Sequence, residues 1–244
     1  MKRNIIFPIF FLIIAELFLR LPIIDNRFFP PPSLIISNTF VAIAQSNLLG
    51  QIFYSLTREA IAFFIAAPLA LLLALLCSHY KKIDDFISPL IAFTFPLPKV
   101  AIFPLMLLIF GIDSASKIAL ISIGLFYLMF IHFRVGFLRL KSSIFFDVIR
   151  IYPFSTSQYV WSFLIKGSLQ EIYTGLQVGF NYALTLVVVS EATVSTNGIG
   201  HFIWRSWDQY RILDVYSGVF VLCLIGFLQY SFFDLLLSRN RRYT

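Results

Sequence analysis

Apolar residues are gathered in long runs along this chain, and most charged residues stand between the runs. A helix needs about 20 mostly apolar residues to cross the hydrocarbon core of a membrane, so windows without Asp, Glu, Lys or Arg mark candidate spans. Clear windows are residues 61–77, 118–133, 172–190 and 215–233. A shorter run at residues 5–21 and an interrupted run at residues 87–112 bring the expected number of transmembrane helices to six.

The composition agrees with this pattern. Hydrophobic residues make up 59% of the chain and charged residues only 13%, whereas a soluble domain carries about 25% charged residues. The net charge of +7 would suggest nucleic-acid binding, but no polar domain is present to carry a basic face, so no nucleic-acid partner is expected. The expected fold class is therefore all-α, a polytopic protein of the lipid bilayer.

The first apolar run resembles a signal peptide because Lys2 and Arg3 precede it. Pro8, Glu16 and Arg20 interrupt the apolar core, however, and a retained first transmembrane helix at residues 1–24 fits better. Glu16 and Arg20 are four residues apart and can neutralise each other on one helix face.

The interrupted run predicts an irregular span. It contains Pro96, Pro98 and Lys99, and each proline removes a hydrogen-bond donor and disfavours helix at the residue before it. Irregular backbone at membrane depth is tolerated only where protein or a water-filled cavity surrounds it, so these three residues are candidates for the translocation path. An ammonium group at a helix centre costs at least about 2.5–3.5 kcal/mol. Lys99 therefore either faces the path, or it snorkels or caps carbonyl groups that Pro96 and Pro98 leave free.

Glu191 is a fourth candidate for the path. It follows the window at residues 172–190 and either meets a solute or partner, or sits at the interface and pairs with Arg205 or Arg211. The three histidines fall on different segments without an i,i+4 partner, so no metal site is expected.

The basic residues predict the orientation. With a cytoplasmic N-terminus, twelve of the 19 Lys and Arg residues fall on the inner side, which satisfies the positive-inside rule and places both termini in the cytoplasm. The inner group comprises Lys2, Arg3, Lys81, Lys82, Arg134, Arg139, Lys141, Arg150, Lys166, Arg239, Arg241 and Arg242.

The inner segment at residues 134–168 is long enough to indicate a function. Residues 144–152 predict a short helix with Asp147 in its first turns, which Pro153 ends. Ser155 and Gln158 have the spacing of a capping box and predict the start of a second helix. Two short capped helices rich in aromatic residues form a docking element for a soluble partner.

Residues 146–177, FDVIRIYPFSTSQYVWSFLIKGSLQEIYTGLQ, resemble the EAA loop of binding-protein-dependent ABC transporter permeases. The segments LPKVAIFPLMLLIFGIDSASKI and LVVVSEATVSTNGIGHFIWRS resemble the nitrate/sulfonate/taurine-type branch. The resemblance implies the permease subunit of an ATP-driven importer in the bacterial inner membrane. Such a subunit moves a small polar or anionic organic solute, of the sulfonate, taurine, nitrate or vitamin-precursor class, by alternating access.

The EAA resemblance implies that the loop couples to an ATPase. The coupling residues are expected to be Asp147, Arg150, Pro153, Ser155 and Gln158. Asp147 stands where the family has glutamate, and Pro153 stands where it has glycine. Pro153 also breaks a helix but fixes φ near about −65°, and Ile165-Lys166 replaces the family's Leu-Pro pair.

The resemblance further implies a permease homodimer, a cytoplasmic ATPase on each coupling loop and an extracytoplasmic solute-binding protein. The chain has no G-x-x-x-x-G-K-[ST] loop, so it is not expected to be an enzyme or to hold a cofactor, and ATP and Mg are expected on the ATPase. The expected domains are the first helix, an extracytoplasmic linker and surface segment at 25–54, a permease core at 55–238 with coupling loop 134–168, and a basic tail at 239–244.

Two other classes fit less well. An ion-driven secondary transporter, the alternative, predicts two related halves with broken spans at corresponding positions, and only one proline-broken run is visible. An intramembrane enzyme would need a motif such as H-E-x-x-H or G-x-S-x-G, and neither occurs.

Overall fold

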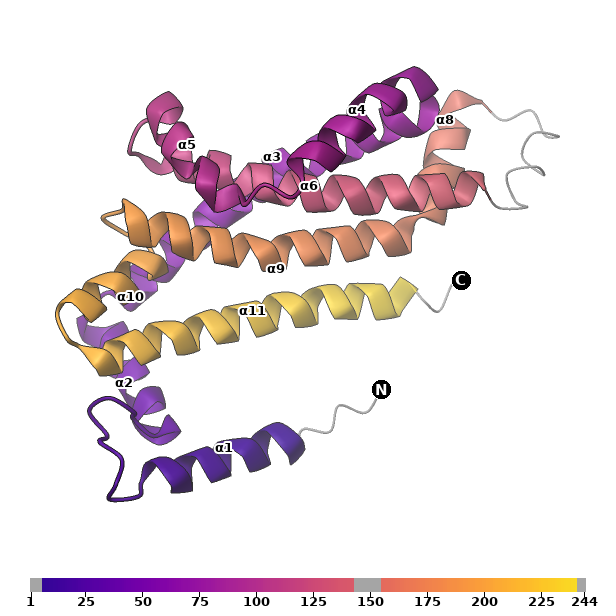
Figure 1. The fold of residues 1–244 in the computed structure, drawn as a ribbon. Coiled ribbons are helices and arrows are strands. Elements are labelled where there is room, and N and C mark those ends of the chain that lie inside the picture. Colours follow the sequence, from indigo (N-terminus) through magenta and orange to yellow (C-terminus); the bar gives the residue numbers. More distant parts are fainter. Residues whose placement is uncertain (1–5, 143–154, 241–244) are drawn as a thin grey trace. The chain divides into compact units, whose positions relative to one another are not determined.

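A computed structural model describes residues 6–142 and 155–240, and every regular element in these two ranges is a helix (Figure 1). The chain divides into two compact units. The first unit contains Met1–Ser55 and Glu191–Ile225, and the second contains Leu56–Ser190 and Gly226–Thr244. Three long helices each contribute a part to both units.

The first unit combines short helices with the ends of long ones. Its elements are α1 (Ile6–Leu19), α2 (Pro32–Gln45), the start of α3 (Leu48–His79), the end of α9 (Leu169–Thr193), α10 (Ile199–Asp208) and the first part of α11 (Ile212–Asn240). Pro31 is extended and Pro32 begins α2, because the missing N–H of a proline is no loss at the first helical position. The buried apolar residues of this unit are Ala42, Leu48, Ile199, Phe202 and Val221.

Helix α1 is tied to α2 by polar contacts. Arg20 Nε donates to Glu16 Oε1 at 2.7 Å, and Ser33 Oγ donates to the same oxygen at 2.7 Å. The predicted neutralisation of Glu16 by Arg20 is confirmed. Helix α1 has 14 residues, which is about 21 Å of helix against about 30 Å of hydrocarbon core.

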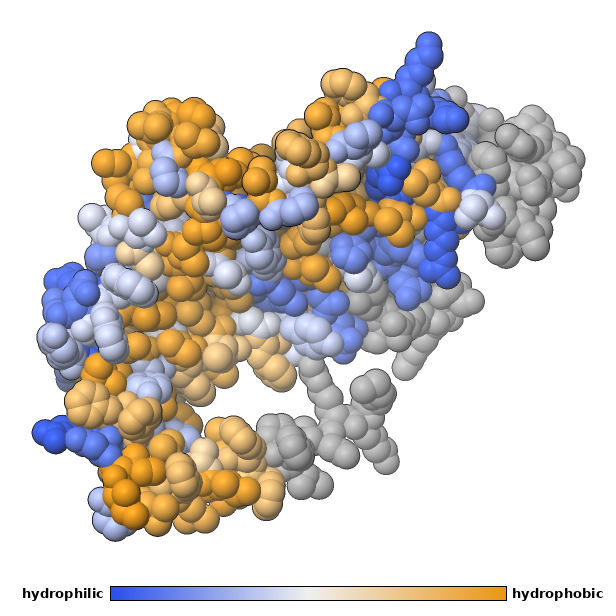
Figure 2. Space-filling view, in the orientation of Figure 1, coloured by the Kyte–Doolittle hydropathy of each residue, from blue (hydrophilic) through white to orange (hydrophobic). Residues whose placement is uncertain are grey.

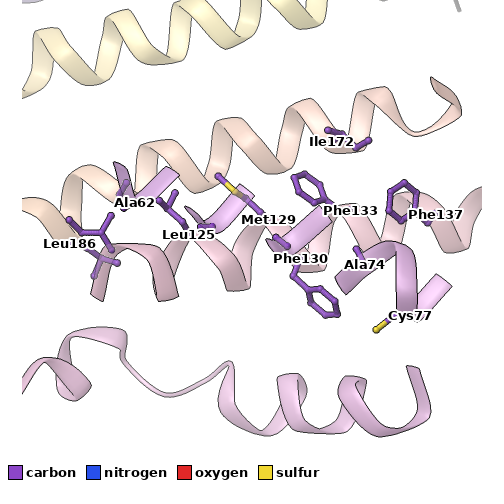
Figure 3. Packing of buried hydrophobic residues seen from close by; sticks show 14 of the residues in the cluster. Ala62, Ala74, Cys77, Leu125, Met129, Phe130, Phe133, Phe137, Ile172 and Leu186 are labelled. Atoms are coloured by element: carbon purple, nitrogen blue, oxygen red, sulfur yellow. The ribbon is translucent and has the colours of Figure 1, made fainter. Parts of the chain in front are cut away.

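The second unit contains the longest buried helices. Its elements are the rest of α3, α4 (Lys81–Thr94), the 3-10 helix η1 (Lys99–Ile102), α5 (Phe103–Phe110), α6 (Ser114–Lys141), α8 (Thr156–Gln158), the π-helix η2 (Tyr159–Ile165), most of α9 and the end of α11. Its core lies where α3, α6 and α9 pack together (Figure 3). Fully buried members include Leu125, Met129, Phe133, Phe137 and Leu186.

Glycines bring α6 and α9 close together. A Cβ added to Gly136 would lie 2.7 Å from Glu171 Cβ, and one added to Gly175 would lie 2.8 Å from His132 Cβ. Small residues let helix backbones approach in a membrane, where packing rather than the hydrophobic effect drives helix association.

The structure confirms a polytopic, all-helical chain. In the described ranges, four helices, namely α3, α6, α9 and α11 up to Leu236, are long and apolar enough to cross a membrane. The pair α4 and η1–α5, bent by 94°, raises the number to five if it forms one broken span. The predicted irregularity in the run at 87–112 is thereby confirmed. Figure 2 shows apolar side chains over the surface of α5, where Leu108 is 82% exposed, as suits a surface that faces lipid.

Candidate translocation and coupling sites

The break between α4 and η1 is held by Lys99. Helix α4 ends at Thr94. The carbonyl group of Thr94 has no N–H partner four residues later, because residue 98 is proline. Lys99 Nζ donates to Thr94 O at 2.9 Å and to Phe95 O at 3.1 Å, and the side chain is buried. Of the two roles considered for Lys99, the geometry shows the capping of freed carbonyls.

A tyrosine of α6 completes this arrangement. Lys99 Nζ lies 3.9 Å from the centroid of the Tyr127 ring, well within cation–π range. The Tyr127 hydroxyl donates to Thr94 Oγ1 at 2.7 Å. We call Thr94, Phe95, Lys99 and Tyr127 the Lys99 clamp. It fixes the broken backbone to an unbroken helix, while Pro96 and Pro98 keep residues 95–98 out of the α-helical ladder.

An ion pair fixes the same two helices at a second level. Arg134 of α6 contacts Asp84 of α4 through two bonds, Nε to Oδ1 at 2.5 Å and a terminal nitrogen to Oδ2 at 2.6 Å. Ser88 Oγ donates to Asp84 Oδ1 at 2.7 Å. A pocket of about 180 Å³ lies between α4 and α6, with Phe95 and Arg134 among its lining residues. Bidentate pairs of this kind are strong and directional.

We expect Asp84→Asn to lower the free energy of unfolding by about 1–2 kcal/mol, because the amide cannot accept both bonds from Arg134. Asp85→Asn is the matched control, since Asp85 is the exposed neighbour on the same helix turn. The comparison requires thermal unfolding of both variants in detergent. Equal midpoints would mean that the Asp84–Arg134 pair contributes nothing to stability.

Glu191 lies in the first unit and is fully buried, with 0% of its surface exposed. Ser55 Oγ donates to Glu191 Oε2 at 2.7 Å, and the backbone N–H of Gly200 donates to the same oxygen at 3.1 Å. The carboxylate therefore lies at the N-terminus of α10, where a negative charge is favoured by the helix dipole. In the described part of the chain, neither Arg205 nor Arg211 pairs with Glu191, and Arg211 pairs with Asp214 instead.

The side chains of Gln51 and Ser55 also accept hydrogen bonds from backbone N–H groups at the start of α10. Gln51 Oε1 accepts from the N–H of Gly198 at 2.6 Å, and Ser55 Oγ accepts from the N–H of Ile199 at 2.8 Å. The first N–H groups of a helix have no partner within it. We call Gln51, Ser55, Glu191 and residues 198–200 the α10 N-terminal network.

The coupling loop is described in part. Asp147, Arg150 and Pro153 lie outside the described residues. The predicted capping box is confirmed: the N–H of Gln158 donates to Ser155 Oγ at 3.3 Å, and the N–H of Ser155 donates to Gln158 Oε1 at 3.0 Å. The helix then continues as the π-helix η2, which the sequence pattern did not predict.

Helix η2 packs against other helices of the second unit. Leu164 is buried in the core cluster. The Tyr159 ring lies 5.8 Å from the Phe163 ring and 6.4 Å from the His79 ring of α3, centroid to centroid. Burial raises the pKa of Tyr159, so its hydroxyl is neutral. Trp161 remains exposed.

Sequence reasoning missed several polar residues inside the spans. Arg58 and Glu59 are buried in α3, where Arg58 Nε donates to Ser114 Oγ at 3.3 Å and Glu59 Oε2 accepts from Gln229 Nε2 at 2.8 Å. Tyr127 in the Lys99 clamp was also missed. The available signal was a polar side chain within or beside an apolar run, which marks an interior-facing position in a membrane helix.

The comparison with known families identifies the class. Residues 66–242 match the family described as binding-protein-dependent transport system inner membrane component. The match covers well over half of the chain, and the chain therefore belongs to this family.

Individual relatives narrow the branch. The chain is 26% identical to SsuC of Bacillus subtilis (strain 168), a protein named for aliphatic sulfonate transport, over 96% of this chain and 84% of SsuC. It is 26% identical to the taurine transport system permease TauC of Escherichia coli (strain K12), over 85% of this chain and 77% of TauC. It is 28% identical to the nitrate import permease NrtB of Synechocystis, over 73% of this chain and 64% of NrtB.

The chain is thus an inner-membrane ABC transporter permease of the sulfonate/taurine/nitrate branch. Members of this family are non-catalytic, multi-pass subunits without a cofactor, and ATP binds on the partner ATPase. Binding-protein-dependent transport also requires a solute-binding protein.

Proposed function

We propose that this permease imports a small polar or anionic organic solute, of the sulfonate, taurine, nitrate or vitamin-precursor class, by alternating access. The observation that carries the proposal is the family match together with relatives that are each named for transport of a small anion or zwitterion. Coupling to ATP hydrolysis runs through residues 147–166 to a separate ATPase.

The proposed topology has six spans and two cytoplasmic termini. The five candidates of the structure, with α4 to α5 as one span, and the apolar helix α1 supply the six segments. The excess of Lys and Arg on one side supports the orientation. The functional unit is proposed to be a homodimer, with an ATPase on the coupling loop of each copy.

The proposed translocation path follows the break at Pro96, Pro98 and Lys99 and includes Glu191. The support is chemical: Lys99 and Glu191 are buried ionisable side chains in a chain that is mostly apolar. Intramembrane ionisable groups commonly mark pathways.

Reconstitution tests the proposal. The permease is purified in mild detergent with its ATPase, placed in liposomes and supplied with the solute-binding protein and labelled taurine, an alkylsulfonate or nitrate. ATP-dependent uptake of at least one of these solutes is expected, together with a native mass that contains two permease copies. Uptake driven by a proton or sodium gradient without any ATPase would instead identify the ion-driven alternative.

The capping box gives a test of coupling. We expect Ser155→Ala with Gln158→Ala to reduce ATPase co-purification severalfold, because loss of a cap costs about 0.5–2 kcal/mol of helix stability. Thr174→Ala is the control, since Thr174 Oγ1 bonds only to its own helix, at Gln170 O. If the double variant retains the ATPase as well as the control does, residues 155–158 do not hold the docking surface.

A further inference from the structure

A polar pocket lies in the first unit, apart from the Lys99 clamp. It has a volume of about 360 Å³, within the range of about 300–1,000 Å³ that is typical of ligand sites. Its walls are the end of α2, the start of α3, one face of α10 and the turn from α10 to α11 (Figure 1). Arg205 and Arg211 are exposed on it, so a solute can reach the pocket from solvent.

The lining is rich in donors and carries no carboxylate. Of the ten residues that line the pocket, two are arginines, one is histidine, four are amides, two are serines and one is Phe202. Guanidinium and amide N–H groups converging on one cavity are the chemistry that recognises an oxyanion.

Its positive charge comes from the two arginines. Burial, followed by repulsion from Arg205, lowers the pKa of His201 from its ordinary value, so the imidazole is neutral at neutral pH. Arg211 pairs with Asp214 and donates to Ser46 Oγ at 3.1 Å. The side chain of Arg205 makes no hydrogen bond or ion pair within the described residues, so its guanidinium group retains its donors for a ligand.

The backbone turn that positions Arg211 contains a strained residue. The N–H of Arg211 donates to Ser206 O at 2.8 Å and the N–H of Tyr210 donates to Trp207 O at 2.9 Å, the two bonds of a Schellman helix end. Such an end usually has glycine where Tyr210 stands with φ of 56°. Strained residues of this kind persist where the surrounding structure requires them, and often lie beside ligand sites.

We propose that this pocket binds a singly charged oxyanion, the sulfonate or carboxylate group of a small organic molecule or of an acidic side chain. The inference rests on the proposed import function and its topology, which puts the α10–α11 turn on the outer side. The anion then comes either from the free solute or from an acidic residue of the solute-binding protein. The shared chemistry is a bidentate contact with Arg205, supported by Arg211 and the surrounding amides.

Protection of arginine from phenylglyoxal tests the proposal on the permease–ATPase complex in lipid nanodiscs. Methanesulfonate is the anionic probe and dimethyl sulfone is its neutral analogue. We expect methanesulfonate to slow the labelling of Arg205 about tenfold at saturation and to leave Arg27 unaffected. Arg27 is a fair control because it is exposed, lies in the same unit and does not line the pocket.

The second arm uses the ligand-free solute-binding protein in place of methanesulfonate. Protection by methanesulfonate identifies the free solute as the source of the anion. If the binding protein protects Arg205, and Arg205→Gln weakens its affinity about tenfold while Arg27→Gln does not, the source is an acidic side chain. Equal labelling of Arg205 with methanesulfonate, dimethyl sulfone and the binding protein would overturn the proposal.

Two measurements on the same preparations separate this proposal from the import function. ATPase co-purification and ATP-driven uptake are recorded for the unmodified complex. If both are present and Arg205 is not protected, only the pocket inference is wrong. If the ATPase is absent and an ion gradient drives uptake, the import function itself is wrong.

Discussion

Gly198→Ala is expected to prevent stable folding of the first unit. Gly198 has φ of 111°, and an added Cβ would lie 2.2 Å from Glu191 Cδ. Backbone strain at such a φ costs about 1–3 kcal/mol, and forcing atoms into a packed site costs about 1–3 kcal/mol more. The new methyl group would also push the carboxylate off the N–H of Gly200, which it accepts at 3.1 Å.

Gly111→Ala separates the two costs. Gly111 also has positive φ, 78°, but nothing lies within 4 Å of an added Cβ. We therefore expect Gly111→Ala to lower the midpoint of thermal unfolding modestly and Gly198→Ala to lower it much further or to abolish expression. Unfolding of the two variants in the same detergent provides the comparison. Equal losses would show that Glu191 moves away at no cost and that the α10 N-terminal network is loosely packed.

Lys99→Met is expected to have the second largest effect. Methionine keeps an unbranched side chain but leaves the carbonyl of Phe95 without the Lys99 donor, leaves Thr94 O with the N–H of Leu97 at 3.3 Å, and removes the cation from the Tyr127 ring. Hydrogen bonds from a charged donor contribute about 1.5–3 kcal/mol, so a loss of about that size in the free energy of unfolding is expected. Because the Lys99 clamp holds the broken span against α6, ATP-driven uptake should fall more than the amount of permease in the membrane.

Lys82→Met is the control, since Lys82 is an exposed lysine of α4. Tyr127→Phe adds a graded step: it keeps the ring over Lys99 Nζ and removes only the hydrogen bond to Thr94 Oγ1. Uptake should be highest in Lys82→Met, intermediate in Tyr127→Phe and lowest in Lys99→Met. Normal uptake by Lys99→Met at normal membrane levels would mean that the clamp serves neither the path nor its motion.

The spans could be predicted from the sequence because hydropathy is a local property. The windows at 118–133, 172–190 and 215–233 lie inside α6, α9 and α11. The charge-free window predicts too short a helix for α3, however, because this helix begins at Leu48 and includes Arg58 and Glu59. These two charges are buried with partners from distant segments, which a local rule cannot show.

In each site, contacts between residues close in sequence could be predicted, and contacts between residues far apart in sequence could not. The carbonyls that Lys99 caps lie four and five residues before it, so the prolines already indicated this role. The Tyr127 ring comes from another helix, and the Arg134 partner of Asp84 is fifty residues away. The same holds for Ser55 and Glu191, which are 136 residues apart. Only the assembled helices bring such pairs together.

Nothing in the pattern of apolar and polar residues predicted the π-helix η2. The capping box of Ser155 and Gln158 predicted where the second loop helix begins, and the structure has it there. Burial of Leu164 and the tilted contact between the Tyr159 and Phe163 rings accompany the wider turn. We attribute the geometry of these seven residues to packing within the second unit rather than to propensity.

The buried Glu191 has a consequence for the proposed import of an anion. A helix N-terminus attracts negatively charged groups by its free N–H groups and its dipole. In the first unit, the N-terminus of α10 binds the carboxylate of Glu191 from α9, and Gln51 and Ser55 accept from the neighbouring N–H groups. A passing anion finds this helix end already neutralised. Transport requires binding that is weak enough for release, so under the proposed function Glu191 would keep a transported anion from binding too tightly at this helix end.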